Sequence, residues 1–196
     1  MIQIHTLTLG LYQTNCYIVH KEGSKSCVVI DPGYDANTIL GRAALLGLQV
    51  EAILLTHGHF DHVGAVAALA ADTDCRVFLK EEELSLPPVM TAGTLFYTDL
   101  YGSDGTLSVA DMDFRILHTP GHTPGSVCLM VGDAMFSGDT LFAGSMGRVD
   151  FPGSSLMDMR KSLRKLRELP GDYRVFPGHA EATTLEYERK TNPYLR

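Results

Sequence analysis

The chain contains 196 residues, 45% of them hydrophobic, which is enough for a substantial core, and we expect one domain covering residues 1–196. The formal net charge is -7, so the chain lacks the basic surface that binds a phosphate backbone, and nucleic acid is not expected as a partner. No apolar run reaches the length of a membrane span, and no membrane partner is expected either.

The four cysteines, Cys16, Cys27, Cys75 and Cys128, are far apart and match no Cys-x-x-Cys spacing. Most of them lie in or beside apolar runs, which predicts reduced and buried thiols. The first ten residues carry no basic segment of the kind that opens a secretion signal. These features predict a cytoplasmic protein. They predict nothing about its oligomeric state.

In the first half of the chain, residues 2–9 alternate between apolar and polar side chains, which predicts a strand. Further strands are predicted at 16–19, 27–30, 52–55 and 76–79, and helices at 39–48 and 63–71. Residues 86–105 then lose this periodicity, and Pro, Gly and aromatic residues are interleaved there. We interpret this long irregular stretch as a wall that faces a substrate, with a packed surface connector as the alternative.

The second half of the chain repeats the alternation of strands and helices. Strands are predicted at 114–117, 127–131, 134–136 and 173–176, and helices at 156–169 and around 184–189. Each half therefore supplies several strands and one or two amphipathic helices. Two sheets packed face to face, with the helices outside, would give an α/β sandwich with the layer order αββα.

The most informative stretch is Thr-His-Gly-His-Phe-Asp-His at 56–62, which lies between a predicted buried strand and a predicted helix. His57 and His59 are two residues apart in extended chain and can point the same way, whereas Asp61 and His62 lie where the helix begins. Imidazole and carboxylate groups are ligands that zinc, iron and manganese accept. Four such side chains within six residues predict metal binding.

One local layout occurs four times along the chain: a short apolar strand, a tight turn and then a residue of metal-ligand type. The residues so placed are His57, His122, Asp139 and His179. If the four strands end at one edge of the sandwich, their loops converge on one site. Glycine in these turns permits the close backbone approach that a crowded site requires.

The number of ligands predicts two metal ions. His57, His59 and His122 supply three nitrogens to one position, Asp61, His62 and His179 supply three ligands to the other, and Asp139 can bridge both. Two dications roughly 3.5–4 Å apart can share a hydroxide at neutral pH. We expect zinc, with iron or manganese as alternatives, since His and Asp ligands accept all three.

The remaining histidines are interpreted differently. His5 and His20 lie in or near the opening strands and are expected to be ordinary surface or core residues. His118 precedes the turn that carries His122 and is expected to support it by packing. Serine chemistry is not expected, because no Gly-x-Ser-x-Gly motif occurs, and the helical His-Glu-x-x-His motif of metalloproteases is absent too.

Four motifs together resemble the metallo-β-lactamase superfamily: 56–62, Pro-Gly-His-Thr-Pro-Gly-Ser at 120–126, Ser-Gly-Asp-Thr-Leu-Phe at 137–142 and Pro-Gly-His at 177–179. The resemblance extends from Asn15 to the end of the chain. It implies the four-layer αββα fold and a binuclear hydrolase with the ligands named above. Within the superfamily, the chain is most similar to the glyoxalase II group of hydroxyacylglutathione hydrolases.

That similarity implies hydrolysis of a small-molecule thioester such as S-lactoylglutathione, with Asp61 orienting the attacking hydroxide. It also implies that Arg148 contacts the thiol carrier, with a structural ion pair to Asp150 as the alternative. Glyoxalase II proper has an additional C-terminal helical domain, whereas this chain ends soon after His179. The short single-domain proteins of the group are therefore the expected relatives.

Other functions fit the same ligands. A persulfide dioxygenase of this family uses one iron ion, and a lactonase is a third enzyme interpretation. A zinc-cysteine β-lactamase is disfavoured because Asp139 stands where a thiolate is expected, and a flavodiiron protein because His59 stands where Glu is expected. From a different class, a noncatalytic metal-dependent binding module is disfavoured because all seven ligands are present.

Overall fold

The first half of the chain forms a six-stranded sheet in the computed structural model, which describes residues 1–102 and 105–195. Its strands, in spatial order, are β1 (Ile2–Leu9), β2 (Thr14–Lys21), β3 (Ser26–Ile30), β4 (Gln49–Leu54), β5 (Arg76–Leu79) and β6 (Asp99–Leu100). Strands β1 to β3 pair antiparallel, and β3 to β6 pair parallel. The parallel strands β3, β4 and β5 therefore all point their carboxyl ends to the same edge.

The second half forms another six-stranded sheet with the spatial order β14-β13-β10-β9-β8-β7. These strands are β7 (Thr106–Val109), β8 (Met112–His118), β9 (Val127–Val131), β10 (Ala134–Gly138), β13 (Arg174–Pro177) and β14 (Thr183–Thr184). Only the pair β10 and β13 is parallel. A separate hairpin, β11 (Leu141–Phe142) with β12 (Ser145–Met146), follows β10.

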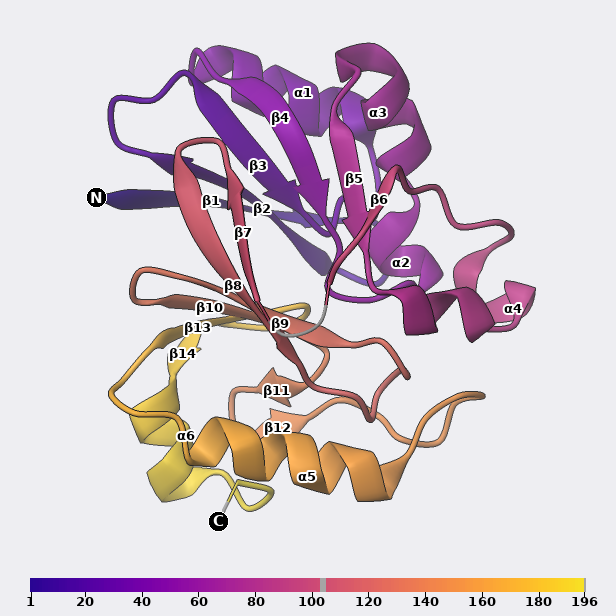
Figure 1. Cartoon of the computed structure of the whole chain (residues 1–196), viewed down its shortest axis with the longest axis vertical. Coiled ribbons are helices and arrows are strands. Elements are labelled where there is room, and N and C mark those ends of the chain that lie inside the picture. The colour runs from indigo at the N-terminus through magenta and orange to yellow at the C-terminus, as the bar shows by residue number, and fades with distance from the viewer. Residues whose placement is uncertain (103–104, 196) are drawn as a thin grey trace.

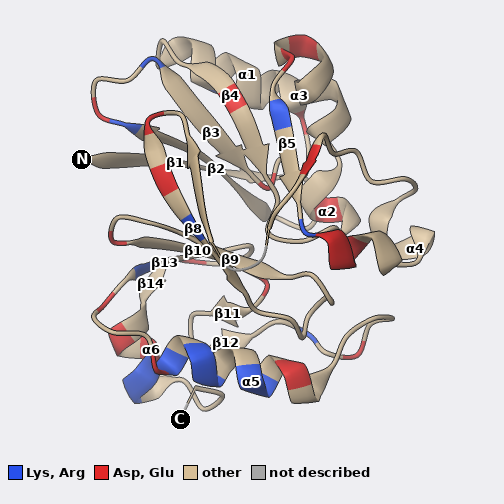
Figure 2. Cartoon of the chain, in the orientation of Figure 1, with Lys and Arg blue, Asp and Glu red and all other residues tan. Residues whose placement is uncertain are grey.

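Helices cover the outer face of each sheet (Figure 1). The first sheet carries α1 (Ala36–Leu45) and α3 (Val66–Thr73), and the second carries α5 (Leu156–Arg167) and α6 (Leu185–Thr191). The Ser155 side chain caps the N-terminus of α5 by accepting from the Asp158 amide. Figure 2 shows Lys and Arg residues along α5, as expected for the polar side of an amphipathic helix.

Three buried clusters hold the layers together. Strand residues of both sheets, such as Ile30, Leu54, Phe114 and Phe136, form the central cluster between the sheets. The other two clusters lie between the first sheet and α1 with α3, and between the second sheet and α5 with α6. The αββα order predicted from the sequence is confirmed. The central strands are covered on both faces, which explains runs such as the fully buried β9, whereas β1, β7 and β8 keep exposed positions.

The predicted elements are all present, but the sequence pattern missed the short ones. Strands β7, β11, β12 and β14 have two to four residues each, too few for a periodic signal. The stretch 86–105 is less irregular than expected, since it contains α4 (Pro88–Thr91) and the edge strand β6. Within it, Ser103 and Asp104 lie outside the described residues. Short helical turns also occur at η1 (Glu81–Ser85) and α2 (Phe60–Val63).

No helix within residues 1–102 and 105–195 is long and apolar enough to cross a membrane.

Candidate metal centre

The loops that follow β4, β8, β10 and β13 meet at one edge of the sandwich. Backbone hydrogen bonds join them directly: the Val127 amide donates to the Thr56 carbonyl, and the Gly178 amide donates to the Gly138 carbonyl. The Asn15 amide in turn donates to the Gly178 carbonyl. The four loops that carry candidate ligands are therefore joined in two pairs, those after β4 and β8 and those after β10 and β13.

His57, His59 and His122 form one group of buried side chains, and one ring nitrogen from each lies within 4.8 Å of the others. The shortest distance, 2.9 Å, joins His59 Nδ1 and His122 Nε2. His57 reaches the group from the end of β4 through Leu55 and Thr56, whereas His122 follows the turn after β8. His59 and His122, which are 63 positions apart in the chain, thus supply nitrogens to one point.

Asp61, His62 and His179 form a second group. Asp61 Oδ2 lies 3.3 Å from His179 Nε2 and 3.8 Å from His62 Nε2. His62 is completely buried on α2, and His179 is partly exposed in the loop after β13. The Thr14 hydroxyl donates to Asp61 Oδ2 at 3.1 Å, which fixes this carboxylate from the start of β2.

Asp139 lies between the two groups. Its Oδ1 is 3.4 Å from His62 Nε2, and its Oδ2 is 3.4 Å from His122 Nε2 and 3.6 Å from His179 Nε2. Oδ1 therefore faces the second group and Oδ2 faces one nitrogen of each group, so the carboxylate lies against both groups, as a bridging ligand does. Gly178 makes this approach possible, because a Cβ atom at that position would overlap Asp139 Oδ1 and His62 Cε1.

Three rings are held in one orientation by an oxygen acceptor at Nδ1. His122 Nδ1 lies 2.8 Å from the Arg148 carbonyl, His179 Nδ1 lies 3.1 Å from the Tyr12 carbonyl, and His62 Nδ1 lies 3.0 Å from an Asp31 carboxylate oxygen. Only a protonated nitrogen can donate to these oxygens. In the neutral ring, each Nε2 is then left with a lone pair that points into the site, the form in which imidazole binds a metal.

The donor atoms left without partners fit a metal ion. Among the described residues, the buried Nε2 atoms of His57, His59 and His62 and the buried Oδ1 atom of Asp139 have no hydrogen-bond partner. Each unsatisfied polar atom of this kind costs about 1–3 kcal/mol when nothing occupies the site. Nitrogen and carboxylate donors in two sets of three suit divalent ions such as zinc, iron or manganese.

The charges of these groups follow from burial and proximity. Burial and the neighbouring histidines lower the pKa of His57, and burial also lowers the pKa of His59 to about 3. Burial acts to lower the pKa of His62 as well, but the Asp139 and Asp31 carboxylates outweigh it and raise that pKa. Most of the site is thus ready to bind a cation, and His62 must release its proton when one binds.

Asp31 is a residue of this site that the sequence analysis missed. Its carboxylate accepts from the Thr56 amide at 2.8 Å and the Thr56 hydroxyl at 2.5 Å, in addition to the His62 ring. It therefore fixes the start of the histidine loop and the orientation of His62. A signal was present: Asp31 follows β3 as His57 follows β4, and parallel neighbours end at the same edge.

Glu83 is a second missed residue. It is 0% exposed, and its carboxylate accepts from the Gly58 amide at 2.5 Å and from the Gly125 amide at 2.6 Å. Gly58 separates His57 from His59, and Gly125 lies in the loop of His122, so one side chain joins the two loops of the first group. Burial raises the pKa of Glu83 to about 6.

A cavity of about 500 Å³ opens over the two groups. Its wall is largely aromatic, and the residues that line it besides the candidate ligands are Tyr12, Phe60, Met90, Phe142, Arg148 and Phe151. Met90 belongs to the stretch 86–105, for which the sequence suggested a wall facing a substrate.

His118 lies behind the site, with Nε2 2.9 Å from the Pro124 carbonyl, and His5 and His20 stack on each other in the opening strands.

Arg148 lines this cavity and pairs with Asp150. Its Nε and Nη2 atoms donate to the two Asp150 carboxylate oxygens at 2.9 and 2.8 Å, and its guanidinium lies 4.1 Å from the centre of the Phe151 ring. The ion pair that the sequence offered as an alternative is therefore present. It occurs in the same side chain that borders the site, so pairing and substrate contact are compatible.

The model of the family described as the metallo-beta-lactamase superfamily matches residues 9–179. Among curated proteins, the chain is 32% identical to hydroxyacylglutathione hydrolase GloC of Haemophilus influenzae, with 99% of this chain and 98% of that protein covered.

Two solved structures are similar throughout. One is described as the BLEG-1 B3 metallo-beta-lactamase, with a TM-score of 0.91, 33% identity and coverage of 100% of this chain and 99% of that one. The other is TTHA1623 in a di-iron-bound form, with a TM-score of 0.84, 39% identity and coverage of 97% and 100%.

Proposed function

The chain belongs to the metallo-beta-lactamase superfamily, and on that premise we propose that it is a two-metal hydrolase that cleaves a small-molecule thioester such as S-lactoylglutathione. The observation that carries the proposal is the position of Asp139, whose two oxygens face nitrogens of both ligand groups at 3.4 Å. We assign His57, His59 and His122 to one ion, Asp61, His62 and His179 to the other, and Asp139 to both.

Divalent ions bound there would supply a water of lowered pKa and polarise the substrate carbonyl. The protein contributes a fixed carboxylate beside that position. Burial alone would raise the pKa of Asp61, but its hydrogen bond with His179 and the charge of His62 lower that pKa below its usual value. Asp61 is therefore ionised at neutral pH and can accept a hydrogen bond from the attacking water, which orients it.

The overall reaction adds water across the thioester, giving a carboxylate and a thiol. A thiol has a pKa of about 8.5 in water, so the thiolate is a good leaving group and departs without a strong proton donor. None of the candidate site residues is an obvious general acid, which supports a thioester over an amide. Arg148 at the rim is proposed to attract the negative charge of the thiol carrier, and its pairing with Asp150 holds it in place.

We propose zinc as the native ion. The four cysteines are buried as free thiols, which supports a reducing, cytoplasmic location. We also propose that residues 1–196 act as one domain. Similarity to GloC, which is described as a hydroxyacylglutathione hydrolase, supports the substrate class.

Iron is the alternative to zinc, because the similar protein TTHA1623 was crystallised in a di-iron-bound form. Iron in this centre would make an oxygen-consuming enzyme such as a persulfide dioxygenase the alternative, and it would act through a single iron. A lactonase uses the same ligands as the proposed hydrolase. The substrate panel must therefore include glutathione persulfide and a lactone.

The test begins with metal quantification on the purified protein. Hydrolysis is then measured on S-lactoylglutathione, an acyl-CoA, a lactone and a cephalosporin, and oxygen uptake is measured with glutathione persulfide. We expect about two ions per chain, rapid thioester cleavage and no oxygen uptake, with activity lost in Asp61→Ala while the circular dichroism spectrum is retained. Oxygen uptake by an iron-loaded protein, or cleavage of the lactone or cephalosporin alone, would overturn the proposal.

A further inference from the structure

A second cavity, of about 530 Å³, lies next to the metal centre. The proposed binding of two metal ions gives this cavity no role. Its lining is almost entirely apolar and consists of Leu9, Gly10, Leu11, Tyr12, Thr14, Gly33, Tyr34, Phe60, Asp61, Gly64 and Ala92. Tyr12, Phe60 and Asp61 also line the cavity over the metal centre. The two cavities therefore share a wall, and that wall contains a proposed metal ligand.

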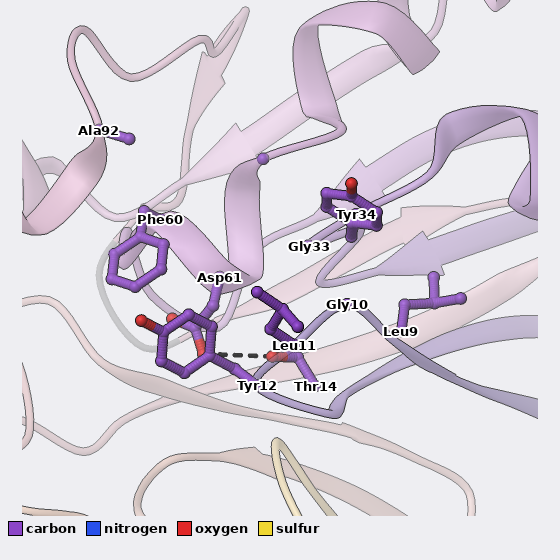
Figure 3. A pocket seen from close by; sticks show the side chains of 11 residues that line it. Leu9, Gly10, Leu11, Tyr12, Thr14, Gly33, Tyr34, Phe60, Asp61 and Ala92 are labelled. Atoms are coloured by element: carbon purple, nitrogen blue, oxygen red, sulfur yellow. Dashed lines mark hydrogen bonds between the residues drawn. The ribbon is translucent and has the colours of Figure 1, made fainter.

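Figure 3 shows how the shared wall is built. Tyr12 and Phe60 stand at one end of the second cavity with Asp61 beside them, and Tyr34 and Leu9 lie at the other end. The rings of Tyr12 and Phe60 meet edge to face with their centroids 5.1 Å apart. The Tyr12 carbonyl accepts from His179 Nδ1, so the wall is attached to the metal centre by its backbone.

The two sides of the metal centre differ in chemistry. On the side of His122 lies Arg148, whose carbonyl accepts from His122 Nδ1 and whose guanidinium borders the site. On the side of Asp61 lies the apolar cavity, whose only charged lining residue is Asp61 itself. A substrate that spans the centre would then place a negative group near Arg148 and an apolar group beyond Tyr12 and Phe60.

We infer that the second cavity binds the acyl chain of the substrate and that the enzyme prefers thioesters of medium-length apolar acids carried on an anionic thiol. This inference rests on the proposed thioester hydrolysis and adds the direction in which the substrate lies. The scissile carbonyl sits at the metal centre, the carrier extends toward Arg148, and the acyl chain passes the Tyr12–Phe60 pair into the cavity.

Exposed apolar side chains around the cavity supply the driving force. Leu11 is 99% exposed at the turn between β1 and β2, and Tyr34, which lines the same cavity, is 64% exposed. An acyl chain that covers them removes apolar surface from water on both partners. Burial of one methylene group stabilises a complex by about 0.8 kcal/mol, which corresponds to roughly a fourfold gain in affinity.

The first measurement is kcat/KM for a series of glutathione thioesters with acetyl, butyryl, hexanoyl and octanoyl chains. We expect kcat/KM to rise about two- to fourfold for each added methylene until the cavity is filled. A profile that is flat, or that falls beyond acetyl, would overturn the acyl-chain assignment and leave thioester hydrolysis itself intact.

The second measurement uses variants at the cavity rim. Leu11→Glu places a carboxylate at the entrance, and we expect the octanoyl-to-acetyl ratio of kcat/KM to fall at least tenfold. The matched control is Leu45→Glu, an equally drastic change at an 83% exposed leucine at the end of α1 that lines neither cavity. An unchanged ratio in Leu11→Glu would also overturn the inference.

Binding gives a readout that does not depend on turnover. Calorimetry of S-octylglutathione and S-methylglutathione with the purified protein should show tighter binding of the octyl compound, with a more negative heat-capacity change. Leu11→Glu should remove this difference and Leu45→Glu should keep it. Equal binding of the two compounds by the unaltered protein contradicts the inference. A protein that binds the octyl compound tightly but hydrolyses no thioester would show that the proposed function, and not the cavity, is wrong.

Discussion

The two halves of the molecule contribute to the proposed metal centre in different ways. The first half supplies four candidate ligands from the single run 56–62, placed by one strand and one short helix. The second half supplies three, His122, Asp139 and His179, each after a different strand. Local chain geometry therefore brings the ligands of the first half together. The ligands of the second half are brought together only by the packing of its sheet.

The two halves also differ in how they use a buried glutamate. Each half has one, Glu83 in the first and Glu188 in the second, and both are 0% exposed. Glu83 joins the ligand loops of both halves through the Gly58 and Gly125 amides. Glu188 stays within the second half, where it accepts from the Gly144 amide and from the Asn192 side chain and so holds the β11–β12 hairpin. Glu83 thus couples the halves at the site, and Glu188 stabilises one half by itself.

The largest expected effect comes from Asp139→Ala. Because Asp139 faces both groups, its loss should reduce bound metal toward zero per chain and lower kcat by at least about 10³-fold, more than the loss of a single oxyanion donor. His59→Ala, which alters only the group shared with His122, should retain one ion. Elemental analysis after zinc loading and dialysis measures both. Two ions per chain in Asp139→Ala would show that Asp139 does not bridge.

Glu83→Gln should have the next largest effect. The amide offers only one acceptor oxygen, so one of the two loop amides loses its partner, and the zinc affinity of the first group should fall about 10- to 100-fold. Competition with a chromophoric chelator measures this affinity. The matched variant Glu188→Gln should leave zinc affinity unchanged, and equal losses in the two variants would mean that both glutamates act on stability alone.

Glu83 also predicts a pH dependence in the metal-free chain. Its pKa is about 6 in the folded chain and 4.5 in the reference state. Between these values the folded chain binds a proton that the unfolded chain has released, so the free energy of unfolding falls as the pH rises from about 4.5 to 6. The loss should be on the order of 2 kcal/mol.

Urea unfolding of the metal-free protein and of Glu83→Gln at pH 4 and pH 7 measures this loss. The variant lacks the titrating group, so the difference in unfolding free energy between the two proteins should shift in favour of the variant at pH 7. A difference that stays constant between the two pH values would contradict the assignment of the shift to Glu83.

The smallest effect is expected at the rim. Arg148→Ala should raise KM for a glutathione thioester about two- to fivefold and leave kcat unchanged, because an exposed charge contributes little in water. Arg76→Ala is a close control, since Arg76 also pairs with a carboxylate, that of Asp99, and lies 4.5 Å from the centre of the Phe78 ring, yet is absent from the site. A similar rise in KM in both variants would remove Arg148 from substrate binding.

The fold was largely predictable because its strands and helices are long enough to show a period. β1 alternates, α5 has a polar and an apolar side, and the turns carry Gly or Pro. The four-residue strands β5 and β13 were predicted from their apolar runs, whereas the two-residue strands were not predictable, since they exist only because a neighbouring strand pairs with them. β14, for example, is defined by its pairing with β13.

The amino-acid sequence by itself determined which residues can bind metal and that their motifs resemble one superfamily. It could do so because each motif is contained in a few consecutive residues. Only the tertiary structure decided that Asp31 orients His62, that Glu83 holds two loops together, and that an apolar cavity shares the Tyr12–Phe60 wall with the centre. Each of these relations joins residues more than 20 positions apart. Contacts of that kind depend on how the sheets and loops pack and leave no periodic trace along the chain.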